Sequence, residues 1–196
     1  MRRIFLMTAL FVYSFMGPLL SAQEQDIHLM FKQTEIKGTR HEFLAEMKSK
    51  GFVPLNNESA EMSGQFAGYA VAVTTDVTPL TETVYQVCAR LEPKSSWKEA
   101  EDDYAVFKTN LTRKYGEPAI AKEQFHSPYR KGDGYELKAA ANGKVEYISC
   151  WILPAGEITI QVVSGGRDFR LLIRYADAAG RELQEAEKTE IFLRDL

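Results

Sequence analysis

Apolar residues recur at intervals of three and four positions in two stretches of the chain, 40–50 and 97–115. This is the spacing of a helix that buries one face. The apolar positions are Phe43, Leu44 and Met47 in the first stretch and Trp97, Ala100, Tyr104, Phe107, Leu111 and Tyr115 in the second. We therefore expect two helices, each packed along one side.

The two predicted helices share their start and stop signals. Thr39 and Ser96 each stand three positions before a glutamate, which is the capping box that satisfies the free amides of a helix's first turn. Gly51 and Gly116 follow the last turns, where a left-handed residue closes a helix. Because the same pair of signals occurs twice, the sequence indicates two copies of one unit.

Short segments of alternating apolar and polar residues follow each helix, and turns rich in glycine or proline separate them. The expected strands are 59–66, 69–75 and 83–91 after the first helix, and 119–125, 135–140, 145–152, 157–163 and 169–175 after the second. Asn142-Gly143 is a hairpin signal between two of them. The apolar residues of 181–196 are loosely at helical spacing, so this segment is also compatible with a short terminal helix.

This pattern predicts an α+β fold of two tandem units, 23–93 and 94–196. In each unit a helix would pack on one face of an antiparallel meander.

Alternation in the second unit also assigns side chains to the two sheet faces. The set expected to face the helix is Ile148, Cys150, Ile152, Ile158, Ile160, Val162, Leu171 and Ile173. The opposite set is Tyr147, Ser149, Trp151, Thr159, Gln161, Arg170 and Arg174. Tyrosine, tryptophan and arginine are enriched in protein interfaces, so the predicted partner-binding residues are Tyr147, Trp151, Gln161, Arg170 and Arg174. The competing interpretation is that the two aromatic residues are covered by a loop or by the terminal segment.

The first 22 residues have the three parts of an export signal. Arg2 and Arg3 form the charged start, 4–20 is apolar, and Ser21-Ala22 is a small-residue cleavage site. The alternative is a membrane anchor, but Thr8, Ser14, Gly17 and Pro18 interrupt the stretch, and a spanning helix needs about 20 apolar residues. We expect cleavage after residue 22, a periplasmic or secreted location, and no stable membrane insertion afterwards.

The net charge and the two cysteines bear on two questions: whether the protein binds nucleic acid and whether it forms a disulfide. Cleavage would remove two positive charges and change the formal charge from −3 to −5, and no basic cluster would remain, so nucleic acid is not an expected partner. Cys88 and Cys150 could pair in an oxidising compartment. Alternation places them on opposite faces, but a register shift of one residue would reverse either assignment, so the pairing stays open.

Signatures of catalytic, metal and cofactor sites are sparse. His28, His41 and His126 do not have the spacing of a helical metal pair. His126 stands beside Ser127, but sequence neighbours rarely form the hydrogen bond that activates a serine. The acidic run at 99–103 is explained by the favourable interaction of carboxylates with the start of a helix. No catalytic residue, metal site or cofactor is predicted.

A pattern of caps, glycines and core aromatics occupies the segments 36–39, 42–43, 50–52, 64–69, 84–87, 96–97 and 114–118. In this pattern the chain resembles a family of exported proteins of unknown function that is common in Bacteroides-type bacteria. The helix-plus-meander plan is also similar to the fold of the β-lactamase inhibitor protein and of the small lipoprotein in the outer-membrane assembly machine. Both are binding proteins, and the inhibitor uses the open face of its sheet, so this resemblance implies binding by analogy of fold.

The leading prediction is a non-enzymatic binding module that holds a protein or peptide of the cell envelope on an open sheet face, as an inhibitor or assembly factor does. A hydrolase of unknown type is the first alternative, and it would need His126 and an acidic residue to converge in one pocket. A structural component of the envelope is the second, and it would associate with itself without a foreign ligand.

Overall fold

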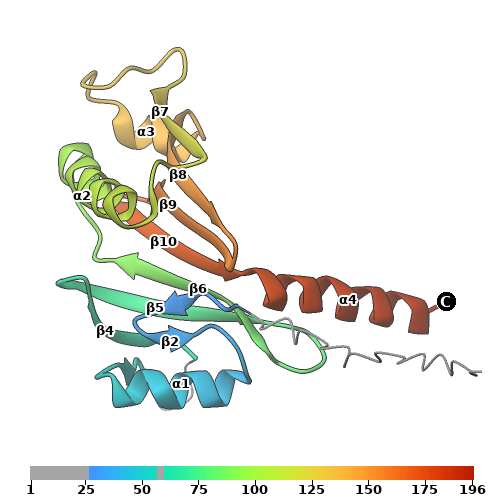
Figure 1. The fold of residues 1–196 in the computed structure, drawn as a ribbon. Helices are drawn as coiled ribbons and strands as arrows, with labels where there is room; N and C mark the ends of the chain where they lie inside the picture. Colours follow the sequence, from blue (N-terminus) through green and yellow to red (C-terminus); the bar gives the residue numbers. More distant parts are fainter. Residues whose placement is uncertain (1–26, 57–59) are drawn as a thin grey trace, which may run out of the picture.

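The computed structural model describes residues 27–56 and 60–196, and the predicted export signal lies outside them. The described residues form an α+β fold with four helices, an eight-stranded antiparallel sheet and a two-stranded hairpin (Figure 1). The helices are α1 (Arg40–Ser49), α2 (Trp97–Tyr115), α3 (Glu136–Ala141) and α4 (Ala178–Arg194). The strands are β1 (Met30–Phe31), β2 (Thr34–Glu35), β3 (Val53–Pro54), β4 (Met62–Phe66), β5 (Tyr69–Val77), β6 (Val84–Leu91), β7 (Ile120–Phe125), β8 (Val145–Leu153), β9 (Gly156–Ser164) and β10 (Phe169–Asp177). None of the helices in this part of the chain has the length and hydropathy that crossing a bilayer requires.

The large sheet joins two antiparallel meanders side by side. Its strand order is β3-β4-β5-β6-β10-β9-β8-β7. The last strands of the two meanders, β6 and β10, meet in the centre, where Ile173 pairs with Ala89 and Tyr175 with Val87. Each half therefore runs from a helix through successive strands to the middle of the sheet (Figure 1). That the halves are copies of one unit stays a prediction.

The two longer predicted helices begin and end as the sequence indicates. Thr39 and Ser96 each accept a hydrogen bond, at 3.3 Å, from the backbone N–H three residues on, and the glutamate there accepts one from the cap residue's own N–H. Gly51 follows α1 with φ of 87°, and Gly116 closes α2 with φ of 85°. Both values lie in the left-handed region that glycine adopts without strain. The capping boxes and the glycine stops are confirmed.

One predicted strand is a helix. The segment 135–140 was expected to extend, but α3 occupies most of it. Its apolar residues alternate as in a strand, yet leucine, lysine and three alanines are strong helix formers. Ala139 is fully buried and Leu137 packs on the core from this helix. Asn142 is therefore the C-cap of α3, and not the first residue of a hairpin turn.

A single apolar core lies between the sheet and the helices α1 and α2. Phe43 and Met47 of α1 belong to the same cluster as the buried stripe of α2. Phe66 at the end of β4 links the two halves, because its ring stacks 4.9 Å from that of Phe31 and 6.2 Å from that of Phe107. The two helix-bearing halves thus share one hydrophobic interior.

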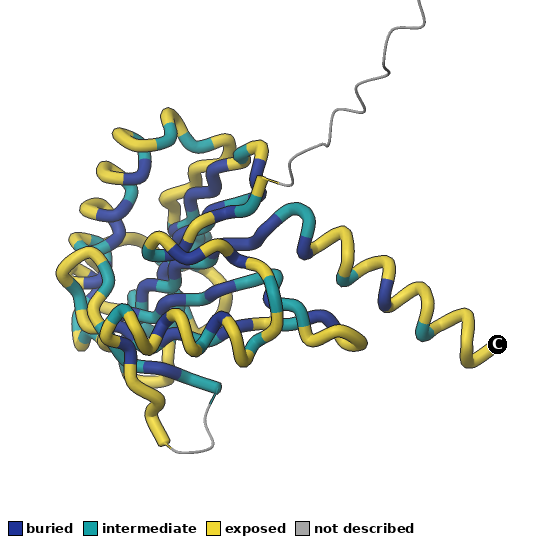
Figure 2. The backbone as a smooth tube through the Cα atoms, turned by 60° about the horizontal axis from the view of Figure 1, so that its bottom comes forward, coloured by how far each residue is buried: buried dark blue, intermediate teal, exposed yellow. Residues whose placement is uncertain are grey.

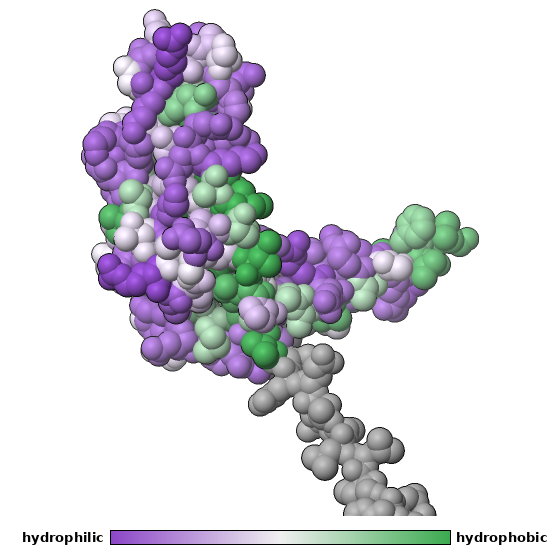
Figure 3. Space-filling model, turned by 45° about the horizontal axis from the view of Figure 1, so that its top comes forward, coloured by the Kyte–Doolittle hydropathy of each residue, from purple (hydrophilic) through white to green (hydrophobic). Residues whose placement is uncertain are grey.

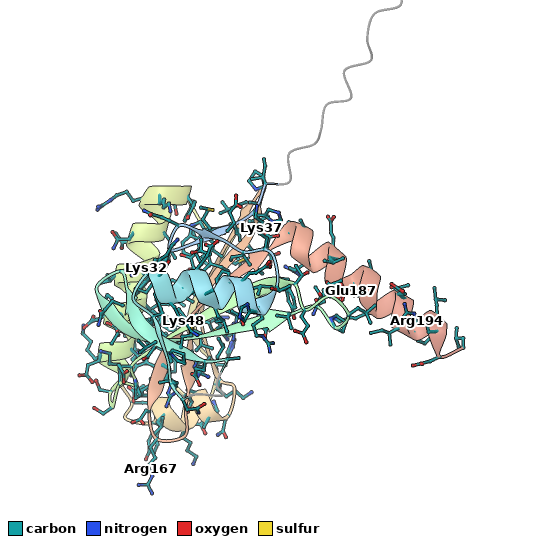
Figure 4. The ribbon with its side chains drawn as sticks, turned by 90° about the horizontal axis from the view of Figure 1, so that it is seen from below. Lys32, Lys37, Lys48, Arg167, Glu187 and Arg194 are labelled. Carbon is teal, nitrogen blue, oxygen red and sulfur yellow. The ribbon has the colours of Figure 1, made fainter. Side chains whose placement is uncertain are left out.

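The terminal helix α4, longer at its start than predicted, projects from the body and is held by polar contacts. Asp177 is fully buried and accepts hydrogen bonds from the backbone N–H of Gly180 at 3.0 Å and of Leu29 at 2.7 Å. Glu187 is 3% exposed and lies where α4 meets the turn between β5 and β6 (Figure 4). The hydroxyl of Thr81 in that turn donates to its carboxylate at 2.6 Å. Beyond this contact the helix is almost wholly exposed (Figure 2).

Candidate functional site

One face of the large sheet is partly exposed along its central strands. We call it the open face and define it by the residues of β6, β10 and β9 that point away from the core: Gln86, Cys88, Arg90, Arg170, Leu172, Arg174, Thr159 and Gln161. All eight are of intermediate exposure, whereas the residues between them, such as Val87, Ile173 and Ile160, are buried. Successive side chains of a strand point to opposite faces, so a regular alternation of burial defines the two sides.

Three of the five predicted partner-binding residues lie together on the open face. Gln161, Arg170 and Arg174 come from the adjacent strands β9 and β10. The Nη1 of Arg174 donates to Oε1 of Gln161 at 3.2 Å. On its other side Arg174 pairs with Cys88 of β6. The pattern of charged and apolar residues in β10 therefore predicted its outward side correctly.

The other two predicted residues, Tyr147 and Trp151, lie in the core. They are 5% and 1% exposed, so their assignment to the open face is wrong. Trp151 pairs with Ile158 of β9, and paired residues of neighbouring strands point to the same side. Its Nε1 donates to the carbonyl oxygen of Gly116 at 2.9 Å, so the indole lies beneath the end of α2.

The error has a physical reason. Both residue sets of β8 are apolar, and alternation does not say which set faces the interior. The aromatic set has more surface to bury, and the ring of Tyr147 packs edge-on at 4.7 Å against Trp97 of α2. Ile152, from the set expected to face the helix, is left 64% exposed. The two aromatic residues are thus covered by α2.

Two arginines of the open face have no carboxylate partner among the described residues. The side chain of Arg170 forms no hydrogen bond or ion pair there, and its Nε is buried without a partner. Gly165 leaves the space that this side chain fills, since a Cβ at that position would lie 3.2 Å from the Nε. The guanidinium of Arg174 donates a hydrogen bond to the side-chain amide of Gln161, and its charge acts to lower the pKa of the Cys88 thiol. Positive charge is thus available at the centre of this face.

Carboxylates around the open face are already engaged. Glu61 pairs with Arg90, and Glu157 pairs with Arg181 of α4 at 2.7 Å. Asp76 accepts a hydrogen bond from the side chain of a neighbouring glutamine. Arg90, which was not among the predicted binding residues, is identifiable from the alternation in 83–91, because it shares a side with Cys88.

Both cysteines are free thiols, and they lie on the same side of the sheet. The expectation of opposite faces is wrong because the reversed orientation of β8 moves Cys150 outward. Cys88, Arg174, Thr159 and Cys150 form a row across four adjacent strands. Three strand spacings, about 14 Å, therefore separate the two cysteine backbones. Burial raises the pKa of the Cys88 thiol, although Arg174 opposes this effect, so the thiol is neutral at physiological pH.

His126 meets an acidic residue, as the hydrolase alternative requires, but the pair is not enclosed. Its Nε2 lies 3.0 Å from Oε2 of Glu146, and the two side chains are 41% and 36% exposed. Hydrogen bonds from Gln124, His126 and Lys122 hold the pKa of Glu146 at about 2, so this carboxylate stays ionised. The pair is therefore exposed to solvent, at the end of the edge strand β7 and on its neighbour β8.

The acidic run at 99–103 is divided among separate contacts. Glu101 accepts hydrogen bonds from the hydroxyl of Tyr147 at 3.0 Å and from Lys131 at 2.6 Å, and Asp103 pairs with a lysine at 3.4 Å. Within 27–56 and 60–196, no three histidine, cysteine or acidic side chains come together as a potential metal site.

A scan against protein-family models, a search of curated proteins and a search of solved structures each found no match. The resemblance to exported Bacteroides-type proteins, and to the fold of the β-lactamase inhibitor protein, stays a prediction.

Proposed function

We propose that this protein is an exported, non-enzymatic binding module that holds an acidic segment of a cell-envelope protein or peptide on its open face. The observation that supports this most directly is the pair Arg170 and Arg174, two cationic side chains on one strand without a carboxylate partner in the described residues. Positions four apart on a strand share a face and are about 13 Å apart. A segment bound along the face would match them with acidic residues at similar separation.

Arginine suits such a role because its planar guanidinium presents parallel N–H groups to a carboxylate. Gln161 extends the polar contact on one side of Arg174, and Leu172 supplies an apolar contact between the two arginines. Binding hot spots combine such anchors with neighbouring contacts that exclude water.

The proposed interaction should respond to salt. The arginines are partly exposed, and charges in this setting are screened over about 8 Å at physiological ionic strength. A complex held by Arg170 and Arg174 therefore weakens as sodium chloride is raised, mainly through slower association.

Affinity capture with matched variants tests the proposal. Immobilised 23–196 is exposed to an envelope extract of the source cells beside the double variant Arg170→Gln, Arg174→Gln. The control Arg167→Gln removes a positive charge from the exposed β9–β10 turn (Figure 4), at a residue that is not part of the open face. We expect a partner that the wild type and the control retain and the double variant loses. The purified partner should then bind the wild type at least about tenfold more tightly than the double variant.

Thermal unfolding shows whether the variants are folded, and substitutions at partly exposed positions should change stability by no more than about 0.5 kcal/mol each. Equal capture by all three proteins would overturn the role of the open face. Self-association of the wild type with no foreign partner would instead favour a structural component of the envelope.

A further inference from the structure

A second candidate site lies on the helix-covered side of the sheet, between the two halves of the molecule. A cavity of about 480 Å³ opens between the C-terminal half of α2 and the tips of the β1–β2 and β4–β5 hairpins. The first half of the chain contributes Lys32 and Phe66 to it, and the second half contributes Phe107, Lys114 and Tyr175. This volume falls within the range of small-molecule sites, about 300–1,000 Å³.

Two tight turns form one rim of the cavity. Lys32 and Gln33 have φ of 48° and 62° in the first hairpin, and Ala67 and Gly68 have φ of 51° and 87° in the second. Positive φ at both turn residues matches the twist of a two-residue hairpin. Such conformations are unfavourable for residues other than glycine and persist where the surrounding structure fixes them. The rim is therefore preformed.

Aromatic rings line the interior. Phe66 and Phe107 lie 6.2 Å apart with nearly parallel planes, and Tyr175 stands edge-on to Phe66 at 6.3 Å. Leu111 and Tyr115 continue this wall along α2. Such a surface favours an apolar chain or ring, since burial contributes in proportion to the apolar area removed from water.

The hydroxyl of one largely buried tyrosine borders this cavity and has no hydrogen-bond partner among the described residues. Tyr175 is 5% exposed and lines the cavity, and its hydroxyl forms no hydrogen bond among the described residues. This hydroxyl is not among the buried polar atoms without a partner, so it is open to solvent at the cavity. A ligand oxygen that replaces water there would accept its hydrogen bond. Burial, and to a lesser extent the nearby Tyr115, raise the pKa of Tyr175, so the hydroxyl keeps its proton and can donate it to a hydrogen bond.

The charged residues of the lining are both cations. Lys32 donates to the carbonyl oxygen of Gln65 at 2.6 Å, and Lys114 lies 4.7 Å from the ring centroid of Tyr115. None of the lining residues is acidic. The ammonium groups are therefore free of carboxylate partners at the cavity and attract an anion.

We propose that this cavity binds a small apolar carboxylate, with its chain or ring against the aromatic wall and its oxygens held by Lys114, Lys32 and the hydroxyl of Tyr175. The combination of an apolar interior, an unpartnered donor and two cations without a lining acid specifies this chemistry. This cavity is separate from the open face, because it lies on the opposite side of the sheet.

Titration calorimetry with decanoate below its micelle concentration tests the proposal, with decanol as the uncharged probe of equal chain length. We expect decanoate to bind the wild type and decanol to bind at least about tenfold more weakly, since hydrogen bonds to a charged group are stronger than those to a neutral one. Lys114→Gln and Tyr175→Phe should each weaken decanoate binding by about tenfold. Lys108→Gln is the matched control, because it removes the same charge from α2 at a residue that pairs with Glu123 outside this cavity, and it should leave binding unchanged.

Lys114→Gln alters an exposed side chain and Tyr175→Phe removes one oxygen atom, so both variants should keep the wild-type fold, as a circular dichroism melt can verify. Absence of decanoate binding, or equal binding of decanol, would overturn the proposal. Equal effects of Lys114→Gln and Lys108→Gln would overturn the assigned role of the cavity cations. Concentration-dependent dimerisation that Tyr175→Phe abolishes and decanoate does not affect would assign the cavity to a second copy of the chain, and would also overturn it.

Discussion

α2 and α4 have similar lengths, 19 and 17 residues, but they are attached to the body in opposite ways. The buried residues of α2 are Trp97, Ala100, Tyr104, Phe107 and Leu111, whereas those of α4 are Gly180 and Glu187. The tip of α4 stands clear of the body in Figure 3. There Phe192 and Leu193 are 64% and 63% exposed.

This difference separates a helix that belongs to the global fold from one that is attached locally. The apolar stripe of α2 contacts the shared core, so moving α2 would expose buried surface from both halves. α4 depends on Asp177 at its start and on Glu187 near its middle. Segments with few buried apolar contacts open at a lower free energy than the whole domain. We expect α4 to detach without unfolding the sheet.

The largest effect should come from α2. Phe107 is 5% exposed and contacts Phe66 and Tyr69 across the core. Phe107→Ala should lower the free energy of unfolding by about 3–5 kcal/mol, because it removes a buried ring and leaves a cavity. Denaturant unfolding followed by circular dichroism would measure this loss. Val106→Ala on the same helix is the control, since Val106 is 44% exposed, and a loss there equal to that of Phe107→Ala would contradict the assigned buried face.

Sequence patterns identified the parts of the fold whose signals are local. For α2, the capping box and the terminal glycine predicted where the helix begins and ends, because these signals join residues close in sequence. β10 was assigned correctly since Arg170 and Arg174 alternate with Leu171 and Ile173, and only one of these sets suits an interior. The strands that form the open face could thus be oriented where one side was clearly polar.

The remaining features depend on contacts that no local pattern contains. β8 has apolar residues on both sides, and only its packing beneath Trp97 decides that Trp151 is internal. The apolar positions of α4 suggested a helix, but its attachment through a buried carboxylate leaves no hydrophobic signal. The cavity forms where two hairpin tips meet α2, which is a juxtaposition of segments far apart in sequence.

Acidification should have an intermediate effect, confined to the attachment of α4. Burial raises the pKa of Glu187, but hydrogen bonds from Thr81, Leu80 and Thr78 outweigh it and leave the pKa below its ordinary value of 4.5. A carboxylate with a lowered folded-state pKa stabilises the fold above its ordinary pKa, and this contribution disappears as pH falls through the folded-state value. The attachment of α4 should therefore weaken below about pH 4.5, whereas the buried stripe that attaches α2 contains no carboxylate.

Backbone NMR shifts of 185–194 and of α2, followed from about pH 6 to about pH 3, would separate the two helices. We expect the α4 shifts to move first. Glu187→Gln removes the ionisable group of the attachment and should give an α4 that is already loosened at about pH 6. A single common transition for both helices in the wild type would contradict local attachment.

The smallest effect on stability should come from the exposed tip of α4. The double variant Phe192→Ser, Leu193→Ser should change the free energy of unfolding by less than about 0.5 kcal/mol, because neither side chain is buried in the monomer. Leu111→Ser in α2 is the matched polar substitution at a residue that is 8% exposed, and it should lower the free energy of unfolding by about 2–5 kcal/mol.

Unfolding measured at two protein concentrations sharpens the contrast. A stability that rises with concentration in the wild type and not in the double variant would mean that the tip of α4 is buried between copies. In that case apolar contacts would attach α4 as well. α2 packs against its own chain, whereas α4 would pack against a second chain.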